Sequence, residues 1–318
     1  ELGLVGSEMC IRDRNDTERE KIFEEAWEHG GLGFRACFQD IAFDKKANDV
    51  AADFIKRKIR SIVKDPKTAD LLTDIDHPYA TKRPPIDTNY FETYNRDNVD
   101  LVDVRSSPIE CITPKGVKTG NAEYELDIIV FATGFDAMTG PLLRLNIEGR
   151  DGIKLADIWE AGPKSYLGLQ IPGFPNLFTI TGPGSPSVLC NMPVAIEQHV
   201  EWVTDCISFL EDNKIASIEA TEDSMDKWVS HVNECADVTL MPHAKHTWYY
   251  GANIPGKPRV FMPYAGGMAR YRAICDDIAK QKYIGFKLGE TDTGDVWSAP
   301  SISVDDLVEA AMVKGPAV

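Results

Sequence analysis

Two adjacent basic residues are the first positions in this sequence whose types could do chemistry. Lys82 and Arg83 stand in the string TKRPP, directly before a Pro-Pro pair. A guanidinium stays cationic at every working pH, so Arg83 carries a permanent positive charge. The pair is a candidate functional site, and the local sequence is also compatible with a solvated basic pair ahead of a Pro-Pro kink.

A small-residue turn at the end of an apolar run is the second candidate. Residues 127–136 read DIIVFATGFD, and the run stops before Thr133 and Gly134. An unbroken apolar run is typical of a strand buried on both faces, as in a parallel sheet. Small residues let the backbone approach a ligand at the strand's carboxyl end, where open α/β sheets bind nucleotides. Taken alone, the run also fits an ordinary strand with a glycine turn, and Asp136 also fits a local turn cap.

A third candidate lies between a predicted strand and a predicted helix. Residues 181–192 read TGPGSPSVLCNM, and Pro193 suits the first turn of a helix. The amides of Asn191 and Met192 should therefore point outward at a helix N-terminus, which favours a ligand with negative charge. Side chains of this segment are candidates for a substrate pocket or for plain core packing: Ser187, Val188, Leu189 and Met192.

Trp248 is the fourth candidate, in the string TWYYGANIPGK. A Trp flanked by Tyr249 and Tyr250 is usually a core or interface aromatic, although it can also contact a ligand. Lys257, which follows Gly256, fits either a phosphate contact or a solvated charge.

Helices are expected to position most of these residues. Apolar residues recur at helical spacing over residues 46–63, 193–211, 222–236 and 266–281. The clearest helix is 193–211. Its predicted buried stripe comprises Ile196, Val200, Val203, Ile207 and Leu210, with His199, Trp202, Cys206 and Phe209 alongside.

The remaining chain predicts one more helix, three strands and an irregular connection. The first helix should start near Asn15-Asp16-Thr17, with Glu20 three residues after Thr17, and end in a turn at Gly30, Gly31 and Gly33. Strands are expected at 98–104, 124–131 and 175–181. Residues 65–97 are expected to be irregular, and a short helix is expected at 304–313. These elements together predict the α/β class.

Composition excludes several classes of function. The net charge of −16 argues against binding to nucleic acid or to an anionic membrane surface. No apolar run reaches the length of a spanning helix, and no signal peptide is evident. The seven cysteines are dispersed and lack CxxC pairs, which fits reduced thiols in a cytoplasm rather than disulfides or a zinc site. His243 and His246 lack nearby ligand partners, so no metal site is expected.

Three strings, in this order, resemble the C-terminal part of a Baeyer–Villiger flavin monooxygenase of the phenylacetone and cyclohexanone types. They are ATGFDAMTG, PKSYLGLQIPGFPNLFTITGPGSPS and TWYYGANIPGKPRVF. The resemblance implies an α/β flavoprotein with two dinucleotide-binding (Rossmann) domains that uses FAD and NADPH. The implied reaction inserts oxygen from O2 next to the carbonyl of a ketone substrate and gives an ester or lactone.

The resemblance also implies roles for the candidate residues. Lys82 would contact the 2′-phosphate of NADPH, and Arg83 would be catalytic, because its charge stabilises the anionic oxygen adduct of the flavin. Thr133 and Gly134 would lie against both cofactors, and the backbone of Asn191 and Met192 would bind FAD. The Trp248 ring N–H would bond the nicotinamide-side ribose. The implied substrate pocket is formed by Ser187, Val188, Leu189 and Met192.

Compared with the family, the chain is expected to be a fragment. Neither of the two GxGxxG turns nor the fingerprint with its central His and Trp occurs in the sequence. We therefore expect a non-native-looking head over 1–14, the C-terminal part of an NADPH-binding domain with a helical insertion over 15–135, the C-terminal part of an FAD-binding domain over 136–290, and a loose tail over 291–318. The fragment is expected to be inactive alone. Two alternatives remain, a flavin monooxygenase that oxidises nitrogen or sulfur, and a non-catalytic remnant or binding module.

Overall fold

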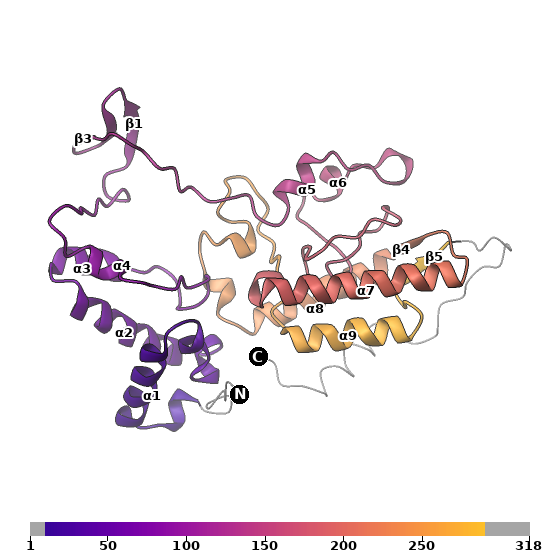
Figure 1. Ribbon diagram of the computed structural model, residues 1–318, viewed down its shortest axis with the longest axis horizontal. Helices are drawn as coiled ribbons and strands as arrows, with labels where there is room; N and C mark the ends of the chain where they lie inside the picture. The colour runs from indigo at the N-terminus through magenta and orange to yellow at the C-terminus, as the bar shows by residue number, and fades with distance from the viewer. Residues whose placement is uncertain (1–9, 290–318) are drawn as a thin grey trace. The chain divides into compact units, whose positions relative to one another are not determined.

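The computed structural model describes residues 10–289, and the chain divides into two compact units, Glu1–Phe135 and Asp136–Val318 (Figure 1). Each unit is described by itself. The predicted helix at 304–313 lies outside the described residues.

Four helices form the body of the first unit: α1 (Asp16–His29), α2 (Lys45–Ile62), α3 (Pro66–Thr73) and α4 (Tyr90–Thr93). The core between α1 and α2 is aromatic, because Phe23 packs against Phe34 and Phe54 with ring centroids 5.2 and 5.1 Å apart. Ile11 is buried in the same cluster. The helix predicted over 46–63 is thus confirmed.

The helix starts follow capping rules, with two corrections to the sequence prediction. The predicted start of α1 near Asn15-Asp16-Thr17 is confirmed, but the Asn15 side chain forms the capping box with Glu18, from whose N–H it accepts at 3.0 Å, and not with the Glu20 noted in the sequence. The predicted turn after α1 is confirmed, since Gly30 has φ 71°. Residues 65–97 are not all irregular, because the Asp65 side chain caps α3. An Asp followed by Pro is a recognised start signal that the prediction overlooked.

The strands of the first unit form a small antiparallel meander of β1 (Ile109–Thr113), β2 (Gly116–Thr119) and β3 (Glu123–Glu125). The strand predicted at 98–104 is absent, and of the strand predicted at 124–131 only Tyr124 and Glu125 lie in a strand, at the end of β3. The apolar run after β3 is extended and exposed: Ile128 is 79% and Val130 81% accessible. The described residues supply no strand beside this run, so it cannot form the predicted parallel ladder.

The second unit is built on α7 (Met192–Asp212), α8 (Glu222–Asp237) and α9 (Met268–Lys280), with the short helices α5 (Gly140–Arg144) and α6 (Leu155–Ile158). Its strands β4 (Ile218–Ala220) and β5 (Phe286–Leu288) form an antiparallel ribbon. The helices predicted at 193–211, 222–236 and 266–281 are confirmed as α7, α8 and α9. The strand predicted at 175–181 is absent.

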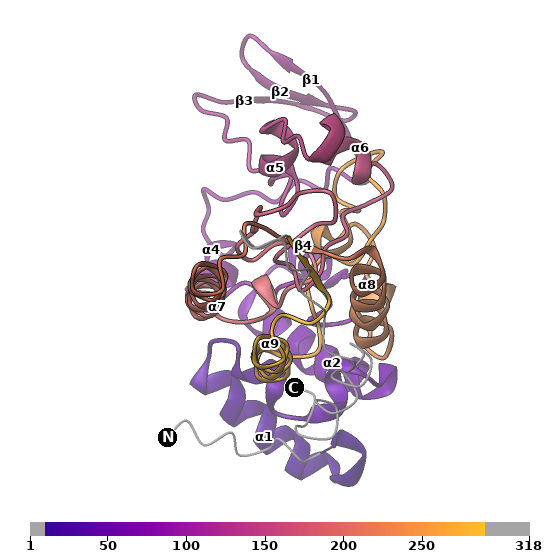
Figure 2. The ribbon, with the colours of Figure 1, turned by 90° about the vertical axis from the view of Figure 1, so that its right-hand side faces the viewer.

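Helices α7 and α9 lie side by side and run in the same direction (Figures 1 and 2). The Trp202 Nε1–H donates to Cys275 O at 2.9 Å, and further along both helices Phe209 packs against Tyr283 just beyond α9. Residues further along α7 therefore contact residues further along α9 or just beyond it, as expected for parallel helices. Most of the buried aromatic residues of this unit form one large core cluster with α8, whereas Trp159 and Phe174 belong to a separate, smaller cluster.

The buried face of α7 matches the predicted stripe only in part, because Leu210 is buried and Val203 packs partly buried against the core, whereas the other three members are exposed. Ile196, Val200 and Ile207 are 39, 48 and 45% accessible. The residues predicted to lie alongside them, His199, Trp202 and Cys206, are buried instead. Hydrophobic spacing located the helix correctly, whereas the face in contact with the core is the one that carries polar and aromatic groups.

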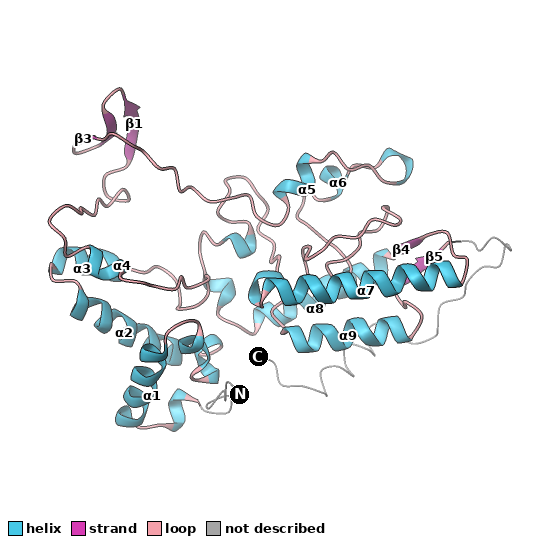
Figure 3. Cartoon of the chain, viewed as in Figure 1, coloured by secondary structure: helices cyan, strands magenta, loops and turns pink. Residues whose placement is uncertain are grey.

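Helices carry most of the regular structure in the described residues, and strands are confined to the two small antiparallel groups (Figure 3). Within residues 10–289, no helix combines the length and apolarity needed to cross a bilayer.

Candidate functional site

Residues 136–138 bring two of the predicted site segments together. Asp136 accepts from Lys257 Nζ at 2.5 Å, which joins this segment to the loop that follows Trp248. Met138 lies against residues 181–192, because Ser187 Oγ is 3.4 Å from Met138 Sδ. Asp136 is therefore an ion-pair partner, and Lys257 is neither a solvated charge nor open to a phosphate while the pair is formed.

The backbone of residues 181–185 is held by groups from other segments. The Trp228 Nε1–H of α8 donates to Gly184 O at 3.0 Å, and the Gly184 N–H donates to Met262 O at 2.6 Å. Ser165 Oγ donates to the carbonyl of Pro183. A loop whose polar backbone groups are paired in this way is preorganised, so the residues that follow it start from a fixed position.

His199 fixes the start of the same loop. Its Nδ1 accepts from the Thr181 N–H at 2.9 Å, and its Nε2 is 2.8 Å from Tyr271 Oη. The Tyr271 hydroxyl donates to Leu167 O at 2.5 Å, so Nε2 of His199 carries the proton. Burial lowers the pKa of His199 to about 4, which keeps the imidazole neutral near pH 7. A neutral ring is required, because a protonated one could not accept from Thr181.

The N-terminus of α7 matches the predicted binding backbone. The helix starts at Met192, one residue earlier than predicted, with Asn191 exposed at its N-cap. Pro193 lies in the first turn, and the Met192 and Val194 amides have no carbonyl within the helix to bond. The first turn of a helix of 21 residues therefore presents free donors and partial positive charge.

The side chains predicted to form a substrate wall divide into two groups. Ser187 is 1% exposed and contacts both Met138 and Met192 through their sulfur atoms. Val188 and Leu189 are partly buried and pack against the main core cluster. Core packing therefore accounts for part of the surface of these two residues.

Trp248 lies on the edge of the same core. It is partly buried and packs edge-on against Tyr249, with ring centroids 4.7 Å apart. The segment from Thr247 turns back on itself, since the Met262 N–H donates to Tyr249 O at 2.8 Å. Trp248 is thus placed at the base of a closed loop rather than deep in the core.

Lys82 and Arg83 lie in the first unit, on the irregular segment between α3 and α4. Lys82 is partly exposed and Arg83 is exposed. Their segment is anchored through Asn48 of α2, which is fully buried. The Asn48 amide accepts from the Tyr79 N–H at 2.8 Å and donates to Tyr79 O at 3.0 Å and Ile41 O at 2.8 Å.

Thr133 and Gly134 are exposed and lie outside any strand. Gly134 has φ 84°, a conformation that strongly favours glycine. The structure has a turn at residues 137–139 rather than at Thr133-Gly134, and the strand predicted before Thr133 does not extend beyond β3.

Sequence reasoning missed two residues that organise the site and gave another no role there. Asn48 and Met138 attracted no prediction, because a single polar residue on a helix and a single Met carry no pattern. His199 was placed beside the predicted stripe of α7, without a role. Its burial was signalled only by its spacing from Trp202 and Cys206.

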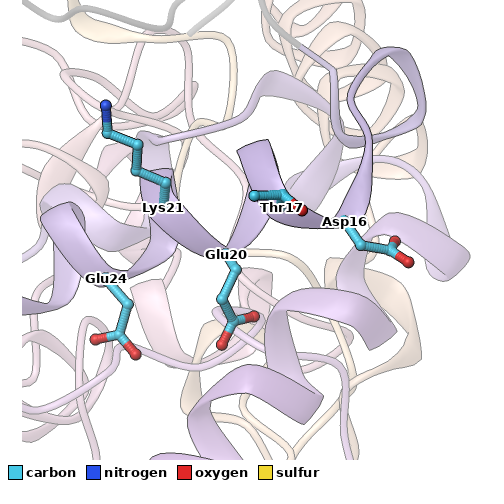
Figure 4. Close-up of a pocket in the computed structure, with 5 residues that line it drawn as sticks. All are labelled: Asp16, Thr17, Glu20, Lys21 and Glu24. Atoms are coloured by element: carbon cyan, nitrogen blue, oxygen red, sulfur yellow. The ribbon is translucent and has the colours of Figure 1, made fainter.

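An open surface depression along α1 contains none of the predicted residues (Figure 4). It is lined by Asp16, Thr17, Glu20, Lys21 and Glu24. Its three carboxylates are all paired, Asp16 with Arg19, and Glu20 with Arg57 and Glu24 with Lys58 at 2.7 Å each. It is a solvated charged face rather than a binding site. Within residues 10–289, no cluster of His, Cys, Asp or Glu could hold a metal ion.

Comparisons with known proteins show what this arrangement is similar to. No family model matches the chain. The Baeyer–Villiger monooxygenase of Pseudooceanicola batsensis is 47% identical over 286 residues, 89% of this chain and 51% of the relative. The cyclohexanone 1,2-monooxygenase of Acinetobacter is 43% identical over 275 residues, 85% of this chain and 50% of the relative. The phenazine N-monooxygenase of Lysobacter antibioticus is 43% identical over 290 residues, 90% of this chain and 52% of the relative.

Solved structures agree. An oxidized steroid monooxygenase bound to NADP superposes with a TM-score of 0.84 at 46% identity, covering 90% of this chain and 54% of that one. A complex of the enzyme OTEMO with FAD and NADP gives a TM-score of 0.85 at 41% identity, covering 89% of this chain and 52% of that one.

The fold is that of part of a monooxygenase with two dinucleotide-binding domains. More particularly, the chain belongs to the Baeyer–Villiger monooxygenase family, and it spans about half the length of the relatives it matches.

Proposed function

We propose that the chain is part of an FAD- and NADPH-dependent Baeyer–Villiger monooxygenase that converts a ketone to an ester or lactone. The observation that carries this proposal is the meeting of three family strings around residues 136–138. This segment contacts Ser187 in one string and Lys257 in another. Relatives that are 47 and 43% identical bear names of this reaction class.

The residues present fit the two cofactors in part. The free amides at the start of α7 suit an electron-rich flavin ring, and the positive φ of Gly134 suits close approach of backbone to a ligand. FAD, when bound, would supply the redox and oxygen chemistry. The fit does not extend to the pyrophosphate groups, because GxGxxG turns are absent from this sequence.

The chain's own residues would bind the two cofactors, stabilise negative charge on oxygen and shape the pocket that orients the ketone. Lys82 would bind the 2′-phosphate of NADPH, and Trp248 would contact the ribose on the nicotinamide side. Thr133 and Gly134 would line both cofactors. Arg83 would supply a permanent positive charge where negative charge develops on oxygen. Ser187, Val188, Leu189 and Met192 would shape the ketone pocket. We infer that the first unit is the NADPH-domain part and the second unit the FAD-domain part.

The test joins this chain to the N-terminal half of the relative from Pseudooceanicola batsensis and supplies NADPH, FAD and a ketone. Ester or lactone should form, as detected by mass spectrometry. Arg83→Ala should lower ester formation at least about a hundredfold while NADPH-driven flavin reduction stays measurable, since only the oxygen step needs the guanidinium charge. If Arg83→Ala retained most of the oxygenation, the catalytic role of Arg83 would be wrong.

Oxidation of a heteroatom is the second candidate, favoured by the 43% identity to the phenazine N-monooxygenase. The same hybrid can be offered a phenazine in place of the ketone. Formation of the N-oxide without any ester from a panel of ketones would favour this function over the first.

A further inference from the structure

An ion pair links two parts of the second unit that are far apart in sequence. Lys257 Nζ lies 2.5 Å from Asp136 Oδ1, across a separation of 121 residues. The Lys257 side chain is only 13% exposed and that of Asp136 33%. The same ammonium approaches Ala137 O at 3.5 Å. Most ion pairs of this unit are more exposed to solvent than the pair of Lys257 and Asp136.

Two glycines make room for the pair. A Cβ at Gly251, which has φ +68°, would lie 3.2 Å from Lys257 Cδ. A Cβ at Gly140 would lie 2.8 Å from the side chain of Asp136. The Lys stem therefore lies across the backbone of its own loop, and the Asp carboxylate lies against the start of α5. The pair is built into the local backbone on both sides.

The loop from Thr247 to Met262 has a closed base and a tip. At the base, the Val260 N–H donates to Tyr250 O at 3.2 Å, next to Trp248. The tip consists of successive turns, in which the Ile254 N–H donates to Gly251 O and the Lys257 N–H donates to Ile254 O. Lys257 ends the tip, and its bond to Asp136 joins the loop to the segment of residues 136–138.

We propose that Asp136 and Lys257 form a latch that positions the Trp248 loop against the segment of residues 136–138. They are positioning residues rather than catalytic ones, since they act through Trp248. That purpose rests on the proposed function, because Trp248 is proposed to bind the nicotinamide cofactor. The latch itself does not, so it can be tested without any cofactor.

The first experiment measures hydrogen exchange of the Ile254 amide in the chain as it stands, using a double-mutant cycle. Lys257→Met and Asp136→Asn should each raise the Ile254 exchange rate about tenfold or more, because a charge-assisted bond that restrains the loop is lost. The double variant should exchange no faster than the single variants, because they break the same contact. Exchange in α9 should stay unchanged.

Lys164→Met is the matched control. It breaks the exposed pair of Lys164 with Asp226, whose side chains are 50 and 61% accessible in the same unit. This control should leave the Ile254 amide unaffected. Unchanged exchange in the single variants, additive effects in the double variant, or faster exchange throughout α9 would each overturn the latch.

The second experiment separates positioning from a local structural role in the hybrid enzyme. Lys257→Met should raise KM about tenfold for NADPH and for NADH alike, because the nicotinamide side that the loop would contact is common to both. An unchanged KM for both cofactors, in a variant whose Ile254 exchange has risen, would overturn the positioning role. A hybrid that forms no ester would refute the proposed function and leave the exchange result intact.

Discussion

Asn48 shows, at the scale of one residue, how a buried amide can place a functional segment. All of its hydrogen-bonding partners are backbone groups, two of them on Tyr79, three residues before Lys82. The position of the basic pair therefore depends on a side chain of α2 that is remote in sequence.

Asn48→Ala should destabilise the first unit by about 3 kcal/mol, because backbone groups of Ile41 and Tyr79 would stay buried without their partner. Urea unfolding would measure the loss, and hydrogen exchange at the Tyr79 amide should rise with it. Asp49→Ala, at the neighbouring exposed position, should change stability by less than about 0.5 kcal/mol. Equal losses in the two variants would show that α2 as a whole, rather than the Asn48 amide, holds the segment.

Lys82→Ala tests the proposed contact with the 2′-phosphate. In the hybrid enzyme, KM for NADPH should rise about ten- to a hundredfold, with little change in kcat, because the phosphate keeps the same charge throughout hydride transfer. KM for NADH should hardly move, since NADH lacks that phosphate. An equal rise in KM for NADPH and NADH would show that Lys82 does not contact the 2′-phosphate.

At the scale of the element, the long helices were predictable, whereas the strands and the short helices α3 and α4 were not. The helices at Lys45–Ile62 and Met192–Asp212 follow from spacing within their own sequence. A strand depends on partners, and the run at 126–131 is compatible with a buried strand only where neighbouring strands exist. The exposed Val130 shows that the described chain supplies none.

In the candidate site, too, features set by local sequence could be predicted, and contacts between distant segments could not. The positive φ of Gly134 and the start of α7 at Met192 could be predicted locally from the positions of glycine and proline. The pairing of Asp136 with Lys257 could not, because it depends on how chain segments 121 residues apart meet.

The buried histidines of α7 and α8 should make the second unit sensitive to acid. Burial lowers the pKa of His199 and of His231 to about 4, from an ordinary value of 6.5. The unfolded chain therefore takes up protons at a higher pH than the folded one. Stability is fully present above pH 6.5 and falls as the pH drops from 6.5 towards 4, by up to about 3 kcal/mol for each histidine.

Urea unfolding between neutral pH and about pH 4.5 measures this loss. His231→Phe should show about half the wild-type dependence of unfolding free energy on pH, because one of the two proton-binding differences is removed. A wild-type stability that is flat over this range would show that the two imidazoles are not held neutral in the folded chain.

At the scale of the whole molecule, the chain presents apolar surface that a folded protein usually covers. In the first unit, Phe131 is 70% and Phe135 87% accessible, beside Ile128 and Val130. In the second unit, the outer face of α7 presents Ile196, Val200 and Ile207. Contiguous apolar surface of this kind favours association and binding of hydrophobic dyes.

The chain should therefore bind a dye such as anilinonaphthalene sulfonate at neutral pH while still giving a helical circular dichroism spectrum. Replacing Ile128, Val130 and Phe131 together by Ser should lower the dye fluorescence by about half without lowering stability, because these side chains have little to lose on the folded surface. Ile86→Ser is the control, a single exposed residue at 68% accessibility. No dye binding by the parent chain would contradict the expectation.

The parallel course of α7 and α9 also governs how this unit can fold. Two helices that run in the same direction need a connection that returns the full length of the first, and here His199 meets Tyr271 across 72 residues. Such contacts have high loop-closure entropy, so they form late and slow the folding of the domain. During synthesis, α7 would leave the ribosome with its aromatic face uncovered and remain so until α9 had been made. In that interval it is the part of the chain that would most need a chaperone.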